Sequence, residues 1–321
     1  MALHFWAIHD ARAAATQAEA SMAAAYGSAT LCWLLSAGVY IAAKWVAPEL
    51  PPWTLCFWRA TIAGLVLLPL VRHDYAPVAQ LVHARGLKLL VIGGLGLAIT
   101  QGLIFVGLNY TSAINAGLIL ALMPMFTMAL ARLLLQEPIG SWQTVGLAIA
   151  FAGMVVIIVH GDLRVLLSLQ FGLGELWIVG AAVCFALYTV LLRRAKFDLE
   201  RLPLLVILLG AGALTALPFY LWEILHDERT ALNASGLTAM AYVAIPGGAF
   251  MYYLYNRSVD ELGAAKAGVF LYLQPIFIAG LAYVLLGEGV RPYHLAGAAL
   301  ILVGVLLVTR MKPRAAAPSG R

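Results

Sequence analysis

Charged residues are scarce in this chain of 321 residues, because Asp, Glu, Lys and Arg together make up 11% of it. An average soluble domain is about a quarter charged. Cysteine is also rare: Cys32, Cys56 and Cys184 all lie in apolar stretches, so we expect buried free thiols and no disulfide scaffold. With 63% hydrophobic residues, the chain cannot hide its apolar surface in one globular core. Disorder and an ordinary soluble enzyme are therefore excluded.

The hydrophobic residues form long runs. A membrane-spanning helix needs about 20 predominantly apolar residues. The stretches that meet this condition are 25–47, 53–71, 89–108, 112–135, 141–160, 174–193, 203–222, 237–256, 263–287 and 292–310. The connections between them are short, and the runs do not alternate as the strands of a membrane β-barrel would. We therefore expect an all-α membrane protein with ten transmembrane helices.

Two terminal segments lie outside these stretches. Residues 1–24 have no basic segment ahead of an apolar core, so they are not a cleavable signal. They form either an amphipathic arm or a frayed N-terminal extension. Residues 311–321 contain Pro313 and Pro318 and are expected to form a disordered cytoplasmic tail.

Lys and Arg are distributed unevenly between the two sides of the expected bundle. One side holds both termini and four connections, and it carries 14 of the 20 Lys and Arg residues. The other side carries four, while Arg59 and Lys266 lie inside spans. Because positive residues collect in cytoplasmic loops, both termini are predicted to be cytoplasmic.

The second half of the sequence repeats the first. The segment that starts at Asn115 aligns without a gap with the segment that starts at Lys266, an offset of 151 residues. The position-sensitive matches are Gly117 with Gly268, Pro124 with Pro275, Glu137 with Glu288, Gly146 with Gly297, and Gly153 with Gly304. Since each half holds an odd number of helices, the second half enters the membrane from the opposite side. We therefore expect two inverted five-helix repeats, residues 25–160 and 174–310, as in many secondary transporters.

Three segments resemble a known family. They are FWRATIAGLVLLPL from Phe57, GLIFVGLNYTSAINAGLILALMP from Gly102, and LYLQPIFIAGLAYVLLGEGVRPYHLAGAALILVGVLLV from Leu271. They are similar to the second, the third and fourth, and the last two helices of the drug/metabolite transporter superfamily, in its ten-helix EamA-type exporter branch. The resemblance covers about residues 25–310 and extends to bacterial aromatic amino-acid exporters. It departs at Gln274, where the family pattern has Glu, so a role for that carboxylate does not carry over.

Arg59 is the charge expected to lie deepest in the membrane, six residues into the second span. Charge in hydrocarbon is costly, so such a residue is a functional candidate. It either binds a carboxylate of the substrate or ties helix-end carbonyls together as a structural strut. Lys266 lies about one turn inside the ninth span and is expected to snorkel to the membrane surface.

Polar and aromatic side chains within the spans are the other candidates for substrate contacts. Aromatic rings offer stacking and cation–π surfaces to a solute, although Trp and Tyr also gather at membrane interfaces. The predicted substrate-binding residues are Trp33, Tyr40, Arg59, Gln101, Asn115, Tyr188, Tyr252, Tyr272 and Gln274. Pro124 and Pro275 are the predicted hinges, because prolines kink or break helices.

Acidic residues are missing from the middle of every predicted span, and His160 and His294 lie at helix ends. Proton-coupled carriers commonly route protons through such groups, so the sequence favours downhill export or exchange over obligatory proton antiport. Glu175 is expected to snorkel at a span end. Glu137 and Glu288 are each expected to complement the N-terminal dipole of the helix that follows.

Small residues form one face of the fifth and the tenth span. Gly146 and Gly153 lie on the first of these faces, and Gly297 and Gly304 lie on the second. Such faces allow helices to approach closely in lipid. They serve either internal packing or a dimer contact, so a monomer and a dimer both remain open.

The resemblance implies a secondary transporter that exports small amphiphilic metabolites by alternating access. The aromatic spans favour amino acids, such as Phe, Tyr and Trp, and the alternative is export of cationic drugs, quaternary amines or lipid-like metabolites. An intramembrane enzyme would need a catalytic pair or a metal cluster, and the sequence has no HExxH motif and no phosphate-binding loop. We expect no enzyme activity, cofactor, metal or nucleic-acid partner. The expected partners are a small-molecule substrate and the lipid bilayer of a bacterial-type inner membrane.

Overall fold

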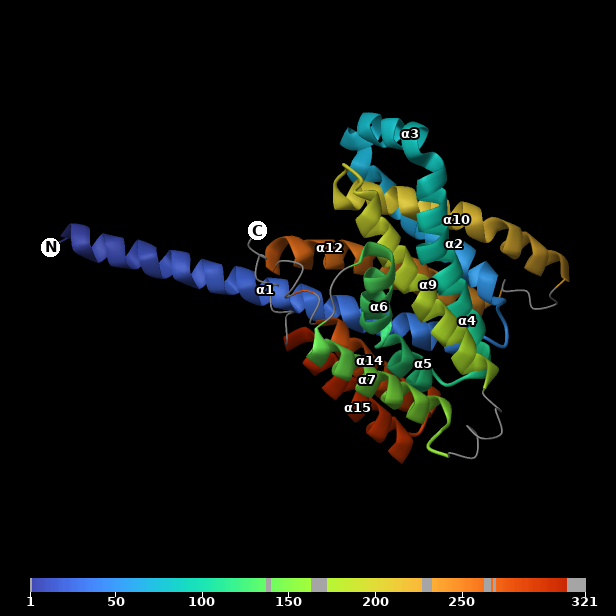
Figure 1. The fold of residues 1–321 in the computed structure, drawn as a ribbon. Helices are drawn as coiled ribbons and strands as arrows, with labels where there is room; N and C mark the ends of the chain where they lie inside the picture. The colour runs from blue at the N-terminus through green and yellow to red at the C-terminus, as the bar shows by residue number, and fades with distance from the viewer. Residues whose placement is uncertain are drawn as a thin grey trace, which may run out of the picture.

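The structure is a computed structural model that describes residues 2–136, 140–162, 172–226, 233–262, 267 and 270–310 (Figure 1). Within these ranges the chain forms helices and their connections, with no β-strand. Eight helices are long and apolar enough to cross a membrane, and two shorter apolar helices, Phe270–Leu286 and Pro292–Leu307, follow them. An all-helical architecture consistent with a multi-pass membrane protein is therefore confirmed. Eight rather than ten of the described helices have the full length of a span.

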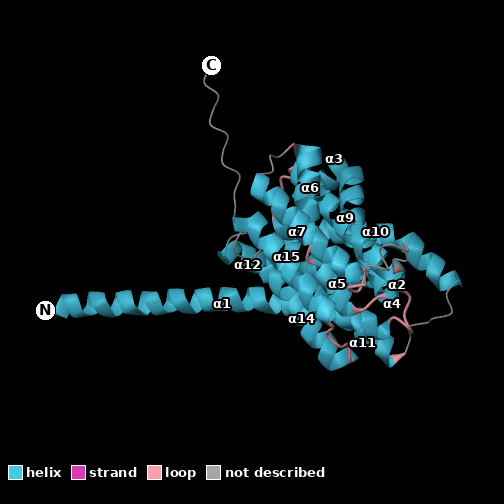
Figure 2. Cartoon of the chain, turned by 60° about the horizontal axis from the view of Figure 1, so that its bottom comes forward, coloured by secondary structure: helices cyan, strands magenta, loops and turns pink. Residues whose placement is uncertain are grey.

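The first helix is longer than expected. α1 begins at Ala2 and ends at Val46, so the N-terminal extension is part of a continuous helix rather than a frayed segment. Figure 2 shows α1 projecting beyond the bundle. The elements that follow in the first half are α2 (Pro52–Leu67), the 3₁₀ segment η1 (Leu68–Asp74), α3 (Tyr75–Gly93), the π-helical segment η2 (Gly94–Ile99), α4 (Thr100–Tyr110), α5 (Ala113–Leu120), α6 (Met123–Leu135) and α7 (Ser141–Ile158).

The second half also contains a span with a π-helical interruption. Its elements are α9 (Leu173–Ala195), α10 (Arg201–His226), α11 (Ala234–Ala244), the π-helical segment η3 (Ile245–Phe250), α12 (Met251–Leu262), the 3₁₀ segment η4 (Phe270–Leu273), α14 (Gln274–Leu281), the π-helical segment η5 (Ala282–Leu286) and α15 (Pro292–Arg310). All three cysteines are free thiols. Lys266 and the expected tail 311–321 lie outside the described residues.

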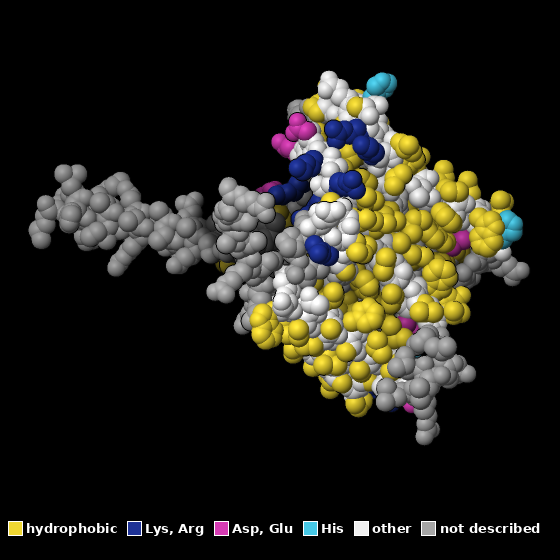
Figure 3. All heavy atoms as spheres, in the orientation of Figure 1, with side chains coloured by type: hydrophobic (Ala, Val, Ile, Leu, Met, Phe, Trp, Pro, Cys, Tyr) yellow, Lys and Arg dark blue, Asp and Glu magenta, His cyan; other side chains and the backbone are white. Residues whose placement is uncertain are grey.

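Hydrogen bonds between helix ends define two opposite faces of the bundle. At one end, Lys44 of α1 donates to the carbonyl oxygens of Leu108 and Thr111, 2.7 and 2.8 Å away. We call this end the far face. At the other end, Arg85 of α3 donates to the carbonyl of Ala195 at the end of α9. Because α1 runs toward the far face and α15 runs away from it, we call this second end the termini face; Figure 3 shows Lys and Arg gathered there.

The outer surface of the bundle is apolar. Leu133 of α6, Leu214 of α10 and Val284 of η5 are all exposed. Figure 3 shows hydrophobic side chains covering much of the surface away from the basic residues. A continuous apolar surface of this kind is unfavourable in water and suits lipid hydrocarbon.

The glycine faces of α7 and α15 pack against each other within the chain. A Cβ atom on Gly153 would lie 2.8 Å from the carbonyl oxygen of Gly297, and one on Gly304 would lie 2.7 Å from Cβ of Ala150. The two backbones therefore approach closely, as small residues permit. These faces serve internal packing and are not available for a dimer contact.

Pro124 and Pro275 each begin a helix after an interruption. α5 ends at Leu120, and Pro124 lies in the first turn of α6. The 3₁₀ segment η4 ends at Leu273, and Pro275 lies in the first turn of α14. Proline suits a first turn because its missing N–H would have no partner in the helix. Both spans are thus discontinuous at the positions of the predicted hinges.

Two carboxylates of the second half cap helices of the first half at the far face. Glu223 of α10 accepts hydrogen bonds from the backbone N–H of Thr54 (2.7 Å) and from its hydroxyl (3.1 Å) at the start of α2. Glu288 accepts from the N–H groups of Ala113 (2.9 Å) and Ile114 (3.1 Å) at the start of α5. Each carboxylate therefore joins the two halves while it satisfies N–H groups that have no partner within their helix.

The interpretation that Glu288 complements the helix that follows it is wrong. The next helix, α15, has no acidic residue in its first turn. Gly287 ends η5 with a φ of 67°, a left-handed conformation that glycine adopts without strain, and this turn leaves Glu288 beside α5. Its repeat counterpart Glu137 lies outside the described residues.

Replacing Glu223 with Gln is expected to lower the melting temperature of the detergent-solubilised protein by about 2–6 °C, because a buried helix cap of about 1–2 kcal/mol is weakened. The amide keeps the size of the side chain but brings N–H donors toward N–H groups that need an acceptor. Differential scanning fluorimetry in one detergent would measure the change.

Glu49→Gln is the matched control at the same face. Glu49 is exposed, and the hydrogen bonds from Ser235 and from Asn233 (2.7 Å) hold the pKa of its carboxyl below its usual value. Its contribution is therefore present at neutral pH and is lost as the pH falls through the lowered pKa. Because water screens it, Glu49→Gln should have the smaller effect, and equal losses in the two variants would contradict the argument from burial.

Candidate substrate-binding cavity

A cavity of 480 Å³ lies between helices of the two halves. α1, α2 and α4 of the first half and α9, α10, α12 and α14 of the second half contribute to its walls. Its size is typical of a site for a small molecule, and most of its lining side chains are apolar or aromatic.

The cavity extends from the middle of the bundle to the termini face. Toward the far face it ends near Tyr40 and Arg59, which lie well inside α1 and α2. Toward the termini face its lining includes Arg201 at the start of α10 and Asn256 in the middle of α12. The side chain of Arg201 is 57% exposed, so the cavity reaches the solvent side of the bundle at this face.

Arg59 places a positive charge in the cavity wall. Its side chain is 4% exposed. Nη1 donates to the hydroxyl of Tyr252 at 3.3 Å, and the guanidinium carbon lies 5.4 Å from the centre of the Tyr252 ring. Nε is buried and has no hydrogen-bond partner in the described part of the chain. The described contacts therefore leave this charge without a counter-ion, and they lack the helix-end carbonyls that a structural strut requires.

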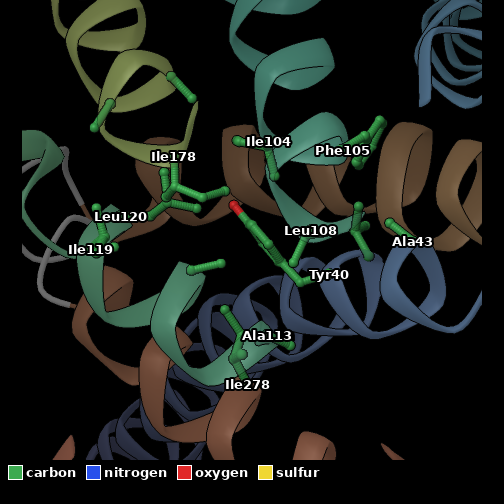
Figure 4. Packing of buried hydrophobic residues seen from close by; sticks show 14 of the residues in the cluster. Tyr40, Ala43, Ile104, Phe105, Leu108, Ala113, Ile119, Leu120, Ile178 and Ile278 are labelled. Carbon is green, nitrogen blue, oxygen red and sulfur yellow. The ribbon is translucent and has the colours of Figure 1, made fainter. Parts of the chain in front are cut away.

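Polar side chains from α1 and α14 meet beside Arg59. Gln274 donates to the hydroxyl oxygen of Ser36 over 2.7 Å, and both residues are buried and line the cavity. Tyr40 lies one turn beyond Ser36 on the same helix face. Figure 4 shows Tyr40 among buried apolar residues such as Leu108. The inner end of the cavity combines hydroxyl, amide and guanidinium groups within an apolar surrounding.

Aromatic rings form much of the remaining wall. Tyr188 and Phe185 of α9 both line the cavity, with ring centres 5.7 Å apart. A Cβ atom on Gly96 of η2 would overlap the Tyr188 ring, so glycine at this position makes room for it. Nearer the termini face, Trp33 and Tyr255 meet edge to face at 5.9 Å. Such walls suit a flat apolar group.

The structure gathers most of the predicted site residues in this cavity. The lining includes Trp33, Tyr40, Arg59, Gln101, Tyr188, Tyr252 and Gln274. Tyr272 and Asn115 are not among the lining residues. Tyr272 packs against the hydrophobic core, and Asn115 lies at the far face.

Asn115 is the centre of a buried polar cluster. Its Nδ2 donates to Glu175 Oε1 at 3.0 Å, and its Oδ1 lies 2.9 Å from Nε2 of His294. The hydroxyl of Thr111 also donates to Glu175. We call this cluster the far-face latch; it consists of Thr111, Asn115, Glu175 and His294. The latch joins α4 and α5 of the first half to α9 and α15 of the second half.

His294 and His160 hold different positions around the latch. His294 is buried, and its Nδ1 accepts a hydrogen bond from the backbone N–H of Arg291, so Nε2 is the nitrogen that donates to Asn115. His160 is 44% exposed at its side chain and lies 3.6 Å from Glu175 Oε1. The latch thus contains one buried imidazole, that of His294, and the half-exposed imidazole of His160 lies beside it.

The expectation that Glu175 snorkels at the membrane surface is wrong, because its side chain is 3% exposed. The neighbouring glycine explains the burial: a Cβ atom on Gly174 would lie 2.7 Å from the backbone nitrogen of Thr111, so α9 starts in direct contact with the end of α4. Two glycines just before Glu175, Gly172 and Gly174, are the sequence signal that marks this close approach.

A bundle with an apolar exterior, a closed far face and a cavity that reaches the termini face defines a multi-pass membrane transporter. The model of the EamA-like transporter family matches residues 24–159 and 172–310, and the chain belongs to this family. The resemblance that the sequence indicates is confirmed.

Curated relatives are similar over most of this chain. The uncharacterized transporter YyaM of Bacillus subtilis is 28% identical over 264 residues, which are 82% of this chain and 86% of that protein. An uncharacterized transporter of Archaeoglobus fulgidus is 26% identical over 279 residues, or 87% and 95%. A probable terminal-alkyne amino-acid exporter of Streptantibioticus cattleyicolor is 28% identical over 229 residues, or 71% and 75%. These relatives are named as transporters and not as enzymes, which agrees with the prediction for this chain.

A solved crystal structure has the same fold. It is 22% identical in sequence, with a TM-score of 0.57 over 89% of this chain and 97% of that chain. At this identity the likeness concerns the fold alone. The chain is thus a transporter by family, and the cavity is the feature that bears on its substrate.

Proposed function

We propose that this protein exports small amphiphilic metabolites, amino acids first among them and aromatic ones such as Phe, Tyr and Trp in particular, by alternating access. The observation that carries the proposal is the 480 Å³ cavity, which has aromatic walls, contains Arg59 and reaches the termini face. An aromatic amino acid has a ring for these walls and a carboxylate for the guanidinium. The amino-acid exporter among the relatives supports this substrate class.

Alternating access in this proposal rests on two inverted repeats, residues 25–160 and 174–310. The family model matches the chain twice, over nearly these ranges. π-helical segments interrupt one long span in each half, and Pro124 and Pro275 follow breaks at matched positions. If the two halves exchange conformations, the termini face closes and the far face opens around the same cavity.

The termini face is proposed to lie in the cytoplasm of a cell with a bacterial-type inner membrane. The excess of Lys and Arg at this face supports the orientation, because positive residues are retained in the cytoplasm. The cavity would then be accessible from the cytoplasm, where an exported metabolite is loaded. Export also explains why a closed far face accompanies an open termini face in this state.

Transport is proposed to be downhill or by exchange rather than driven by ATP. None of the described lining residues is Asp or Glu, the side chains that commonly carry protons through a transporter site. The aromatic walls also favour the alternative substrates, cationic drugs and quaternary amines, through cation–π contacts. Arg59 opposes these cations by charge repulsion. A lipid-like metabolite differs from an amino acid in its longer apolar tail.

Flux into proteoliposomes tests the proposal. Labelled Phe, Tyr and Trp are expected to equilibrate at least about 10-fold faster across vesicles that contain the purified protein than across empty vesicles. The reason is that the charged groups cross through a cavity in the protein and avoid the high cost of entering hydrocarbon. The rate of downhill exchange with substrate inside the vesicles should not depend on an imposed pH or voltage gradient. Rates equal to those of empty vesicles would contradict the proposed substrates, and inhibition by quaternary amines would favour the cationic alternative.

Two tyrosines make a matched pair of variants for the same assay. Tyr252→Ala removes a ring that lines the cavity and contacts Arg59, and it should slow the flux about 10-fold. Tyr272→Ala removes a ring of the same size that does not line the cavity, so the flux per folded molecule should change less than about 3-fold. Equal effects of the two changes would place the substrate elsewhere.

A further inference from the structure

The charge balance of the cavity is one-sided. Arg59 and Arg201 line it, and no described lining residue is Asp or Glu. Arg201 is paired with Asp260 near the solvent, whereas Arg59 is buried and belongs to no described ion pair. The acidic side chain that contacts α2, Glu223, is engaged at the helix N-terminus. The inner part of the cavity therefore carries an uncompensated positive charge.

Arg59 has hydrogen-bonding capacity that the described residues do not use. A guanidinium has five N–H donors, and the described bond uses one of them, from Nη1 to Tyr252. Nε is buried without a partner. A buried charge with unpaired donors is costly, and an anion that accepts two parallel hydrogen bonds relieves this cost. A carboxylate has that geometry.

We propose that the group recognised in the substrate is its carboxylate, held by Arg59, and that the amino group of an amino acid has no charged partner in the site. The preferred ligand is then an apolar monocarboxylate, and a zwitterionic amino acid is one member of that class. This inference deepens the proposed function, on which it rests. It also extends the substrates to carboxylates that lack the amino group, and it excludes amines without a carboxylate.

The remaining polar groups agree with this assignment. Gln274 donates to Ser36, and Tyr40 presents a single hydroxyl to the same region. These neutral groups can accept a hydrogen bond from an ammonium group but cannot balance its charge. The aromatic walls pack against the apolar body of the ligand in either case. Recognition thus depends on one end of the ligand and on its apolar body.

Binding to the purified full-length protein in detergent tests the proposal with ligands matched in size. 3-Phenylpropionate is expected to bind within about 3-fold of phenylalanine, and at least about 30-fold more tightly than the neutral 3-phenylpropionamide, since one charge-assisted pair is lost in the amide. 4-Methylpentanoate and its amide form a second pair without a ring. If neither carboxylate binds more tightly than its amide, the proposal is overturned.

Arg59→Gln locates the effect. In this variant the preference for 3-phenylpropionate over its amide should fall to nearly 1, while binding of the amide changes little, since the ring contacts remain. Arg59→Lys keeps the charge without the planar fork and should retain an intermediate preference of about 3- to 10-fold. A preference that persists unchanged in folded Arg59→Gln, or in Arg59→Lys if the first variant does not fold, would overturn the role of Arg59.

The outcomes separate this inference from the proposed function. If Phe, Tyr and Trp do not cross proteoliposomes but the carboxylates bind better than their amides, the amino-acid substrate is wrong and the carboxylate site stands. If the amino acids are transported but 3-phenylpropionate and 4-methylpentanoate bind no more tightly than their amides, the transporter assignment stands and the Arg59 proposal fails.

Discussion

Asn115→Asp is expected to shift this protein about 10- to 100-fold toward a state that is open at the far face, a change of about 1.4–2.8 kcal/mol. The substitution exchanges one amide nitrogen for oxygen and leaves the size of the side chain unchanged. In the wild-type protein that nitrogen donates to Glu175 at 3.0 Å. In the variant, a carboxylate oxygen at position 115 and one of Glu175 would lie this close to each other.

Two buried carboxylates so close together cannot both remain ionised in place. Either one of them takes up a proton, or the α4–α5 corner and α9 separate. At high pH separation should dominate, because protonation is costly there. At low pH a protonated carboxyl can donate to its neighbour, as the amide of Asn115 does, so the latch should close again. The variant is therefore expected to open at roughly pH 8 and to close at roughly pH 5.

Spin labels at Tyr110 of α4 and Leu285 of η5, both exposed near the far face, would measure the separation by pulsed electron resonance. A longer distance in Asn115→Asp at pH 8, reverting at pH 5, is the expected result. A folded variant whose distance distribution matches the wild type at both pH values would show that the latch does not hold the far face closed.

A second substitution serves as the control. Combining Asn115→Asp with Glu175→Gln exchanges the amide and the carboxylate, so one donor and one acceptor again face each other. In the double variant the negative charge moves to position 115, which lies within reach of His160, because Nδ2 of Asn115 is 3.3 Å from Nε2 of His160. We expect the double variant to be closed at both pH values. Persistent opening would mean that the single change acts through disordered packing rather than through repulsion.

Gly304→Leu is expected to abolish most folded protein, because it inserts a side chain between α7 and α15. A Cβ atom at this position would already lie 2.7 Å from Cβ of Ala150 and closer still to backbone atoms of α7. Backbone atoms cannot rotate away as the end of a flexible side chain can. Overpacking of a close helix contact costs about 1–3 kcal/mol or more, a large part of the stability of a typical domain.

The measurement is the yield of monodisperse protein after detergent extraction, together with its melting temperature. Gly210→Leu and Gly280→Leu are matched controls, since a Cβ atom at either position meets nothing within 4 Å. Both residues are exposed on the apolar surface, so leucine there should be tolerated. A Gly304→Leu variant with wild-type yield would show that α7 and α15 do not depend on this contact.

The α7–α15 contact and the far-face latch have different roles in one mechanism. α7 and α15 pack through a dense glycine contact that has no slack, so this pair is suited to remain together during transport. The far-face latch consists of a few hydrogen bonds between the halves, which can break when the halves separate. In an alternating-access cycle the first contact would persist and the second would open.

Much of the cavity could be predicted because its residues repeat along helices. Trp33 and Tyr40 lie two turns apart on α1, and their position within apolar spans marks them as central. Arg59 stands out in the sequence because a charge inside an apolar span is costly in hydrocarbon. Both signals are local and can be read without knowing how the helices pack. Ser36 and Thr189 also line the cavity and were missed, because a small hydroxyl inside a span also satisfies the carbonyl of its own helix.

The latch could not be predicted from such local signals. Depth within a single span places Asn115 in the substrate site and Glu175 at the membrane surface. Their contact depends on how closely α9 approaches the end of α4, which Gly174 permits. The cap that Glu288 forms on α5 likewise depends on the turn at Gly287 and on which helix lies opposite.

By itself the sequence determined the class of the protein: apolar runs of span length, an internal repeat and an uneven distribution of Lys and Arg all follow from composition along the chain. The tertiary structure alone decided which polar residues bind each other. Asn115 meets Glu175 and His294, which are 60 and 179 positions away. The physical reason is that hydropathy acts within one helix, whereas hydrogen bonds and charge pairing depend on distances of a few ångströms between helices that only packing brings together.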